Sequence, residues 1–259
     1  MSWKNFEEEC TAYLNEKYGT KFEQQGDSNS TISDILYRGD SKTFYIEAKM
    51  PNAQCGQFVL LPDLKKSVFK YSPKNKTNEN EYTRMIIDFM NINFYEFCNS
   101  GTTGSAINIQ KSVFYNWIIK YYREKGVEFF ITKDTEDFLI FPIDQISKYF
   151  NVIAKYREKK SGSSNLNKSN KSDFEYAMIN AGIDFIFNGL EIISDKNLDG
   201  IKVKGNKYDY LIRKKVSNYM VRKLSNTRNA NVIFSIELMK YDDEQQRKDI
   251  IQFEKSIRK

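Results

Sequence analysis

The sequence predicts an α/β fold in which a mixed central β-sheet is flanked by helices, with a basic, strand-like region near the C-terminus. Three patterns indicate this class. They are an apolar stripe at helical spacing in residues 3–18, a β-hairpin pattern in residues 32–48, and two helical stretches (82–97 and 107–125) followed by strand patterns at 127–132 and 138–143. This order of elements predicts a sheet covered by helices.

The composition is that of a folding, globular chain. Its 259 residues are 40% hydrophobic and 15% aromatic, which is enough to build a core. No apolar run reaches the length of a membrane span, and the start of the chain lacks the apolar segment of a signal peptide. Cys10, Cys55 and Cys98 are widely spaced without a CxxC motif, so we expect reduced thiols in a cytoplasmic protein.

The chain contains no histidine, and this excludes several catalytic designs. Serine and cysteine hydrolases with a histidine base, histidine-based zinc proteases and nucleases with a histidine general base all require an imidazole. A nuclease without histidine is left mainly with carboxylates and lysine. The formal charge of +6 is consistent with a polyanionic partner such as nucleic acid.

The first helix, residues 3–18, carries an acid within its apolar stripe. Glu7 stands four residues after Trp3 and three before Cys10, where it would face a site. The alternative is that Glu7, Glu8 and Glu9 together favour the positive end of the helix. A short strand over residues 21–25 and a turn-rich connection lead from this helix to the hairpin.

The hairpin itself brings together two acids and a lysine. Side chains alternate along its second strand, so Glu47 and Lys49 share one face, and Asp34 from the first strand can meet them. Two hard carboxylate ligands suit Mg²⁺, together with waters and phosphate oxygens. A lysine on the same face can hold the attacking water, so the residues favour metal-assisted hydrolysis of a phosphodiester.

The segments Ser33-Asp34 and Glu47-Ala48-Lys49 resemble the active-site motif of the PD-(D/E)XK nuclease superfamily, with serine in the place of proline. The resemblance implies an αβββαβ core over residues 1–156 and catalysis by Asp34, Glu47 and Lys49. It also implies Mg²⁺ held at Asp34, Glu47 and Ala48, and a first-helix glutamate at the site, best matched by Glu7.

Within the superfamily, the chain looks most like a type II restriction endonuclease, because of its length and its second, basic region. The same analogy implies double-stranded DNA as substrate, a symmetric homodimer, and a cognate DNA methyltransferase in the host. Two other functions stay open at this point. One is a structure-specific repair or recombination nuclease, and the other is a non-catalytic nucleic-acid-binding protein with a nuclease-like fold.

After Lys49, the sequence predicts a loop and then a helix from Phe58 to Tyr71. Gln54 and Gln57 in this loop are candidates for contacts with DNA, and the alternative is that they are ordinary polar loop residues. Residues 72–81 read as an exposed loop, and residues 144–156 as a helix that starts at Asp144.

Residues 157–173 form a Ser/Asn/Lys-rich stretch that predicts a flexible loop, and residues 174–259 are expected to pack on the core and contact DNA. Arginine and asparagine can read base edges, whereas lysine serves the DNA backbone. The alternative is a solvated edge of a sheet. The candidate DNA contacts here are Arg213, Lys214, Lys215, Arg222, Lys223, Asn226, Arg228 and Asn229.

Overall fold

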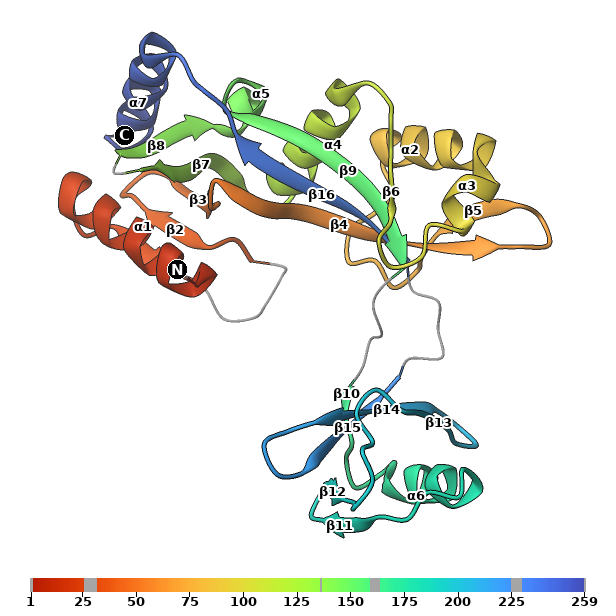
Figure 1. Cartoon of the computed structure of the whole chain (residues 1–259). Helices are drawn as coiled ribbons and strands as arrows, with labels where there is room; N and C mark the ends of the chain where they lie inside the picture. Colours follow the sequence, from red (N-terminus) through yellow and green to blue (C-terminus); the bar gives the residue numbers. More distant parts are fainter. Residues whose placement is uncertain (1, 26–31, 136, 159–163, 225–229, 259) are drawn as a thin grey trace. The chain divides into compact units, whose positions relative to one another are not determined.

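The computed structural model describes residues 2–25, 32–135, 137–158, 164–224 and 230–258. The chain forms two compact units, shown in Figure 1: the first combines residues 1–157 with 231–259, and the second spans residues 158–230. Each unit has its own sheets and its own core. No helix in the described part of the chain is long and apolar enough to cross a membrane.

The first sheet of unit 1 is mixed, as predicted. Its strand order is β1-β2-β3-β7-β8, and β3 runs parallel to β7 whereas the other neighbours are antiparallel. The strands are β1 (Phe22–Gln24), β2 (Ile35–Arg38), β3 (Thr43–Ala48), β7 (Val127–Asp134) and β8 (Asp137–Pro142). The predicted hairpin and the two predicted strands after residue 126 are therefore confirmed.

Two helices cover one face of this sheet. Helix α1 (Trp3–Tyr18) starts at Ser2, whose hydroxyl accepts a hydrogen bond from the Asn5 amide, and helix α7 (Asp243–Ile257) comes from the end of the chain. Both contribute to one apolar core with the strands. Phe253 of α7 packs edge-on against Phe129 of β7, with ring centroids 5.1 Å apart. Burial of these aromatic rings and of the aliphatic side chains around them holds the layers together.

A second sheet of unit 1 has the order β5-β4-β16-β9-β6. Its strands are β4 (Asn52–Asp63), β5 (Val68–Tyr71), β6 (Ser105–Ala106), β9 (Phe150–Glu158) and β16 (Ala230–Leu238). Helix α4 (Lys111–Arg123) packs on it through Trp117, whose ring stacks 4.2 Å from that of Phe234. The remaining helices of the unit are α2 (Glu81–Ile92), α3 (Phe94–Cys98), the 3-10 turn η1 (Ile143–Gln145) and α5 (Ile146–Tyr149).

Two predicted helices in this unit are wrong. The helix expected from Phe58 to Tyr71 is instead the antiparallel pair β4 and β5, because Phe58 and Leu60 point into the core of the second sheet. The helix expected over residues 144–156 ends at Tyr149, and the chain continues as β9. In β9 the residues Phe150, Val152, Ala154 and Tyr156 are buried in strict alternation, which is a strand pattern.

Unit 2 is a small sheet with one helix. The sheet order is β11-β12-β15-β14-β13, with β10 added on β15. Helix α6 (Lys171–Asn180) covers one face through Phe174 and Met178. The strands are β10 (Ser164–Asn165), β11 (Ile186–Asn188), β12 (Glu191–Ile193), β13 (Lys202–Lys204), β14 (Asp209–Lys214) and β15 (Tyr219–Lys223).

The two compact units differ from the divisions expected from the sequence. The boundary near residue 157 agrees with the expected end of the core. Residues 164–173, expected to belong to a flexible loop, contain β10 and the start of α6. Residues 231–259 were expected to continue the C-terminal part, but β16 and α7 belong to unit 1. The second unit is thus an insertion between β9 and β16, which are neighbours in one sheet.

Candidate active site

The β2–β3 hairpin places Asp34 opposite Glu47. Ile35 pairs with Ile46, so one step further along the antiparallel ladder Asp34 faces Glu47. The Ala48 amide donates a hydrogen bond to Asp34 Oδ2 at 3.0 Å, which fixes the carboxylate against the end of β3. The hairpin register thereby brings the two acids together, as the sequence pattern predicted.

Lys49 lies in the same cluster and is held on several sides. Its ammonium is 2.6 Å from Glu47 Oε1, and the side chains of Glu47 and Lys49 are only 6% and 15% exposed. The backbone amide of Lys49 donates to the Ile131 carbonyl at 2.9 Å, which continues the parallel pairing with β7. The ammonium also lies 5.8 Å from the centroid of the Tyr122 ring on α4. Burial by itself would lower the pKa of Lys49, but the carboxylates of Glu47 and Asp34 raise it, so the ammonium stays charged.

Of the three consecutive glutamates in α1, Glu7 is the one that reaches this cluster. It is buried, and its Oε2 atom has no hydrogen-bond partner among the described residues. Burial raises the pKa of Glu7, and the charge of Glu47 adds to this, whereas Lys49 lowers it. Glu8 is exposed, and Glu9 instead forms an ion pair with Lys133 at 2.6 Å. Glu7 is thus the member of the three that can take part in the site.

The same opposing effects act on the pKa of Asp34. Burial raises the pKa of Asp34 to about 8, with a further contribution from Glu47, while Lys49 and the Ala48 amide act in the opposite direction. A buried carboxyl group next to other carboxylates is unfavourable unless a cation joins it. The cluster therefore has the electrostatic character of a cation site.

The donor atoms of this cluster fit a hard divalent cation. No group of three or more acidic or cysteine side chains in the described ranges is already arranged around a common point as metal ligands. Mg²⁺ does not need such a group, because it usually binds one or two carboxylates and completes its shell with waters and phosphate oxygens. Asp34 and Glu47 can supply the carboxylates, and the unpartnered Oε2 of Glu7 adds a further oxygen nearby.

The site also includes residues that the sequence reasoning did not single out. The Cys55 thiol donates to the Tyr122 hydroxyl over 4.0 Å, and both side chains are buried beside Lys49. Burial raises the pKa of Cys55 to about 12, so it remains a neutral thiol. No local signal in the sequence connects Cys55 or Tyr122 with Lys49, because β4 and α4 meet β3 only in the folded chain.

The glutamines after Lys49 lie on β4 and not in a loop. Gln54 and Gln57 are both exposed. The side-chain oxygen of Gln57 accepts a hydrogen bond from Asn231 Nδ2 at 3.0 Å, which joins β4 to β16. Both glutamines lie in β4, the strand that follows Lys49.

The candidates in unit 2 divide between the two faces of its sheet. Leu211 pairs with Arg222 and Arg213 with Met220, so the two arginines share the face opposite the buried Tyr210, Ile212 and Val221. Lys202 and Lys204 of β13 belong to the same face by register, as do the acids Asp209 and Glu191. Basic side chains thus outnumber acidic ones among these residues, and we call this the basic face.

The other candidates in unit 2 lie elsewhere. Lys214 is exposed at the end of β14, Lys215 forms an ion pair with Glu191 at 2.5 Å, and the Lys223 ammonium lies 4.2 Å from the centroid of the Tyr208 ring. Asn226, Arg228 and Asn229 lie outside the described residues.

Comparison with known proteins places this geometry in a family. No family model and no curated protein sequence matches the chain. Among solved structures, HhaI endonuclease in complex with DNA is similar over 100% of both chains, with 48% sequence identity and a TM-score of 0.79. Similarity of sequence and structure over the full length of both proteins shows a common family. The chain belongs to the type II restriction endonucleases related to HhaI endonuclease.

Proposed function

We propose that this restriction endonuclease cuts double-stranded DNA in a Mg²⁺-dependent reaction, and that Asp34, Glu47 and Lys49 form its catalytic centre. The observation that carries the proposal is the convergence of these three side chains at the end of one hairpin. Asp34, Glu47 and the backbone carbonyl of Ala48 would hold the metal, with Glu7 beside them. The chemistry that Mg²⁺ supplies at such a site is stabilisation of the charge that develops on the phosphate oxygens.

The protein side chains prepare the site for that chemistry. Asp34, Glu47 and the buried Glu7 gather carboxylates where a cation is needed. Lys49, held between Glu47 and the Tyr122 ring, is placed to hold the attacking water or to offset the charge of the scissile phosphate. With a metal bound, Asp34 and Glu47 would be its carboxylate ligands, and the Lys49 ammonium, 2.6 Å from Glu47 Oε1, would lie beside them to contact the phosphate or the water.

Substitution of the three residues tests the proposal. Asp34→Ala and Glu47→Ala should abolish Mg²⁺-dependent cleavage but preserve DNA binding, because each removes an oxygen ligand and reduces the negative charge near the phosphates. Lys49→Arg should lower the single-turnover rate by on the order of 10²–10⁴-fold, since the planar guanidinium cannot reproduce the position of the ammonium. Full cleavage by either alanine variant would exclude the assignment.

We further propose that Gln54, Gln57 and the basic face of unit 2, including Arg213 and Arg222, contact DNA. Lys214, Lys215 and Lys223 would contact the phosphates of the DNA backbone. Asn226, Arg228 and Asn229 would also contact DNA. A homodimer, a cognate methyltransferase and a cytoplasmic location also stay predictions. Family membership favours restriction over the repair and non-catalytic functions considered from the sequence.

A further inference from the structure

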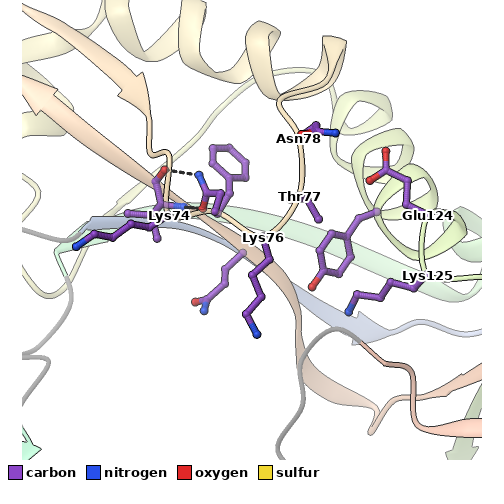
Figure 2. A pocket seen from close by; sticks show the side chains of 11 residues that line it. Lys74, Lys76, Thr77, Asn78, Glu124 and Lys125 are labelled. Carbon is purple, nitrogen blue, oxygen red and sulfur yellow. Dashed lines mark hydrogen bonds between the residues drawn. The ribbon is translucent and has the colours of Figure 1, made fainter.

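A hollow of about 410 Å³ opens in unit 1 beside the catalytic cluster. Three parts of the chain form its walls: β4, the segment that follows β5, and the end of α4 with the residues after it (Figure 2). Glu7, Asp34, Glu47 and Lys49 do not line this hollow, whereas Gln57 does. Its lining residues are Gln57, Phe58, Val59, Lys74, Asn75, Lys76, Thr77, Asn78, Tyr121, Glu124 and Lys125.

The lining is basic. It includes three lysines, Lys74, Lys76 and Lys125, and one carboxylate, that of Glu124. Figure 2 shows Lys76 and Lys125 extending toward the same open side of the hollow, whereas the Glu124 carboxylate turns the other way. An anion that enters from the open side therefore meets two ammonium groups and polar side chains.

Hydrogen bonds hold the segment that carries Lys74 and Lys76 in place. The Asn75 side chain donates to the Val59 carbonyl at 2.9 Å and accepts from the Val59 amide at 2.8 Å, as a neighbouring strand would. The Ser72 amide also donates to the Val59 carbonyl at 3.1 Å. Lys74 and Lys76 therefore belong to a segment that these hydrogen bonds hold in place, so less conformational entropy is lost when a ligand binds.

Lys125 lies in the lining of the hollow and also near Lys49. Its ammonium lies 4.3 Å from the centroid of the Tyr121 ring and 5.1 Å from that of Tyr122. Lys49 lies 5.8 Å from the same Tyr122 centroid, so the two ammonium groups are no more than about 11 Å apart. One strand of DNA advances ~3.4 Å along the helix axis per phosphate, so phosphates bound at the two ammonium groups are separated by at most about three nucleotides.

We propose that this hollow is a subsite for a DNA backbone phosphate, bound by Lys125 and Lys76 within about three nucleotides of the scissile phosphate. The inference rests on the proposed function for the position of the cut at Lys49. Its role is to fix the register of the strand relative to the catalytic centre, since phosphate contacts position a protein on DNA without reading sequence.

The first test measures DNA affinity against salt concentration in the absence of cleavage, with Ca²⁺ or EDTA in place of Mg²⁺. Lys125→Gln keeps most of the aliphatic stem that lies on the tyrosines, and Lys76→Ala removes the second charge. Each variant should flatten the slope of log affinity against log salt by about one unit. Lys125→Arg should preserve it. Lys255→Ala, an exposed lysine on α7, is the matched control and should leave the slope unchanged.

The second test locates the phosphate. Duplexes carrying one neutral methylphosphonate at successive positions around the mapped cut are bound to the parent protein and to Lys125→Gln. At the contacted position, the methylphosphonate and the Lys125→Gln substitution should weaken binding no more together than either does alone. Additive losses at every position, or a coupled position more than three nucleotides from the cut, would overturn the subsite. Full cleavage by Asp34→Ala with this coupling intact would instead overturn only the catalytic assignment.

Discussion

Asp34 shows most clearly the conflict between burial and charge in the active site. Its carboxyl group is packed beside Glu47 and Glu7, and its pKa rises to about 8 although Lys49 and a backbone amide oppose this. The folded, metal-free protein therefore binds a proton that the unfolded chain has already lost between pH 4 and pH 8. Because the folded state holds more protons in this range, its stability decreases as the pH rises.

We predict that the melting temperature of the metal-free protein falls between pH 6 and pH 9. Asp34→Asn should flatten this dependence and melt at a higher temperature at the alkaline end, because the amide carries no charge to be buried. Thermal unfolding in EDTA measures both effects. Asp40→Asn, in the exposed turn of the same hairpin, provides the control. If Asp34→Asn follows the parent at every pH, the acid does not carry the proton.

Glu7 allows a comparison within one helix. We predict that Glu7→Gln weakens Mg²⁺ or Mn²⁺ binding by about 10–100-fold, the usual effect of losing a group that supports metal ligands. The fold should be preserved, since the amide occupies the same volume. Glu8→Gln, exposed on the next position, should bind the metal like the parent protein. Calorimetric titration separates the two variants, and equal affinities would place Glu7 outside the metal site.

At the scale of the elements, β4 connects the hairpin that ends at Lys49 with the hollow that Gln57, Phe58 and Val59 line. It begins three residues after Lys49, passes the buried Cys55, and ends in the pair with β5. Gly56 in this strand has a φ of +111°, and a side chain there would contact the Trp117 ring at 2.7 Å. The close approach of β4 to α4 therefore requires glycine at this position.

The hydrogen bonds between Asn75 and Val59 of β4 lead to a prediction that distinguishes the effect of an ordered segment on DNA affinity from the effect of its charge. Asn75→Ala should destabilise the fold by about 1–3 kcal/mol, because it leaves the Val59 amide without its partner. DNA affinity should fall while the salt slope stays that of the parent, since no charge is lost. Chemical denaturation and salt titration measure the two effects, with Asn116→Ala at an exposed position of α4, outside the hollow, as control. A flattened slope would contradict this reading of Asn75.

The β2–β3 hairpin, which carries the proposed catalytic residues, could be predicted from the sequence because its determinants are local. Residues 32–48 carry the alternation, the turn and the charged residues within one stretch, and the register follows from them. The same is true of the αβββ start of the core and of Glu7, which interrupts an apolar stripe. The aromatic and lysine neighbours of Lys49 come from other elements, so only the tertiary fold shows them.

The wrong predictions also concern segments whose structure depends on contacts distant in the sequence. Phe58 to Tyr71 contains an apolar run whose spacing suits a helix or a strand, and the addition of β4 to β16 decides in favour of a strand. In residues 150–156, the alternation Phe150-Asn151-Val152 and onward was a usable strand signal that the helical pattern before it concealed. The return of the chain to unit 1 after residue 230 depends on a long-range pairing that no local pattern reports.

For the whole molecule, the active site belongs to one unit and a separate basic face to the other. All of Glu7, Asp34, Glu47 and Lys49 lie in unit 1, and the arginines of β14 and β15 lie in unit 2, which has its own apolar core. Figure 1 shows β9 and β16 running in opposite directions beside each other. The insertion thus interrupts what would otherwise be a β-hairpin.

We predict that replacing residues 158–230 by a short Asn-Gly turn yields a folded protein, because adjacent antiparallel strands can be joined by two residues. This variant should keep metal-dependent nicking of DNA at raised protein concentration. Its salt slope should flatten by several units, since the phosphate contacts of the basic face are lost. Circular dichroism, nicking assays and salt titration test these statements. An unchanged slope would show that unit 2 does not bind DNA.

The insertion of unit 2 between two paired strands also has a kinetic consequence. If unit 2 binds DNA as proposed, its attachment to unit 1 at both ends makes its rebinding intramolecular, at an effective concentration in the millimolar range whatever the concentration of the protein. Individually weak contacts would then suffice, because either unit could release the DNA briefly while the other retains it. The residence time on DNA is expected to increase through slower dissociation, with little change in the rate of encounter.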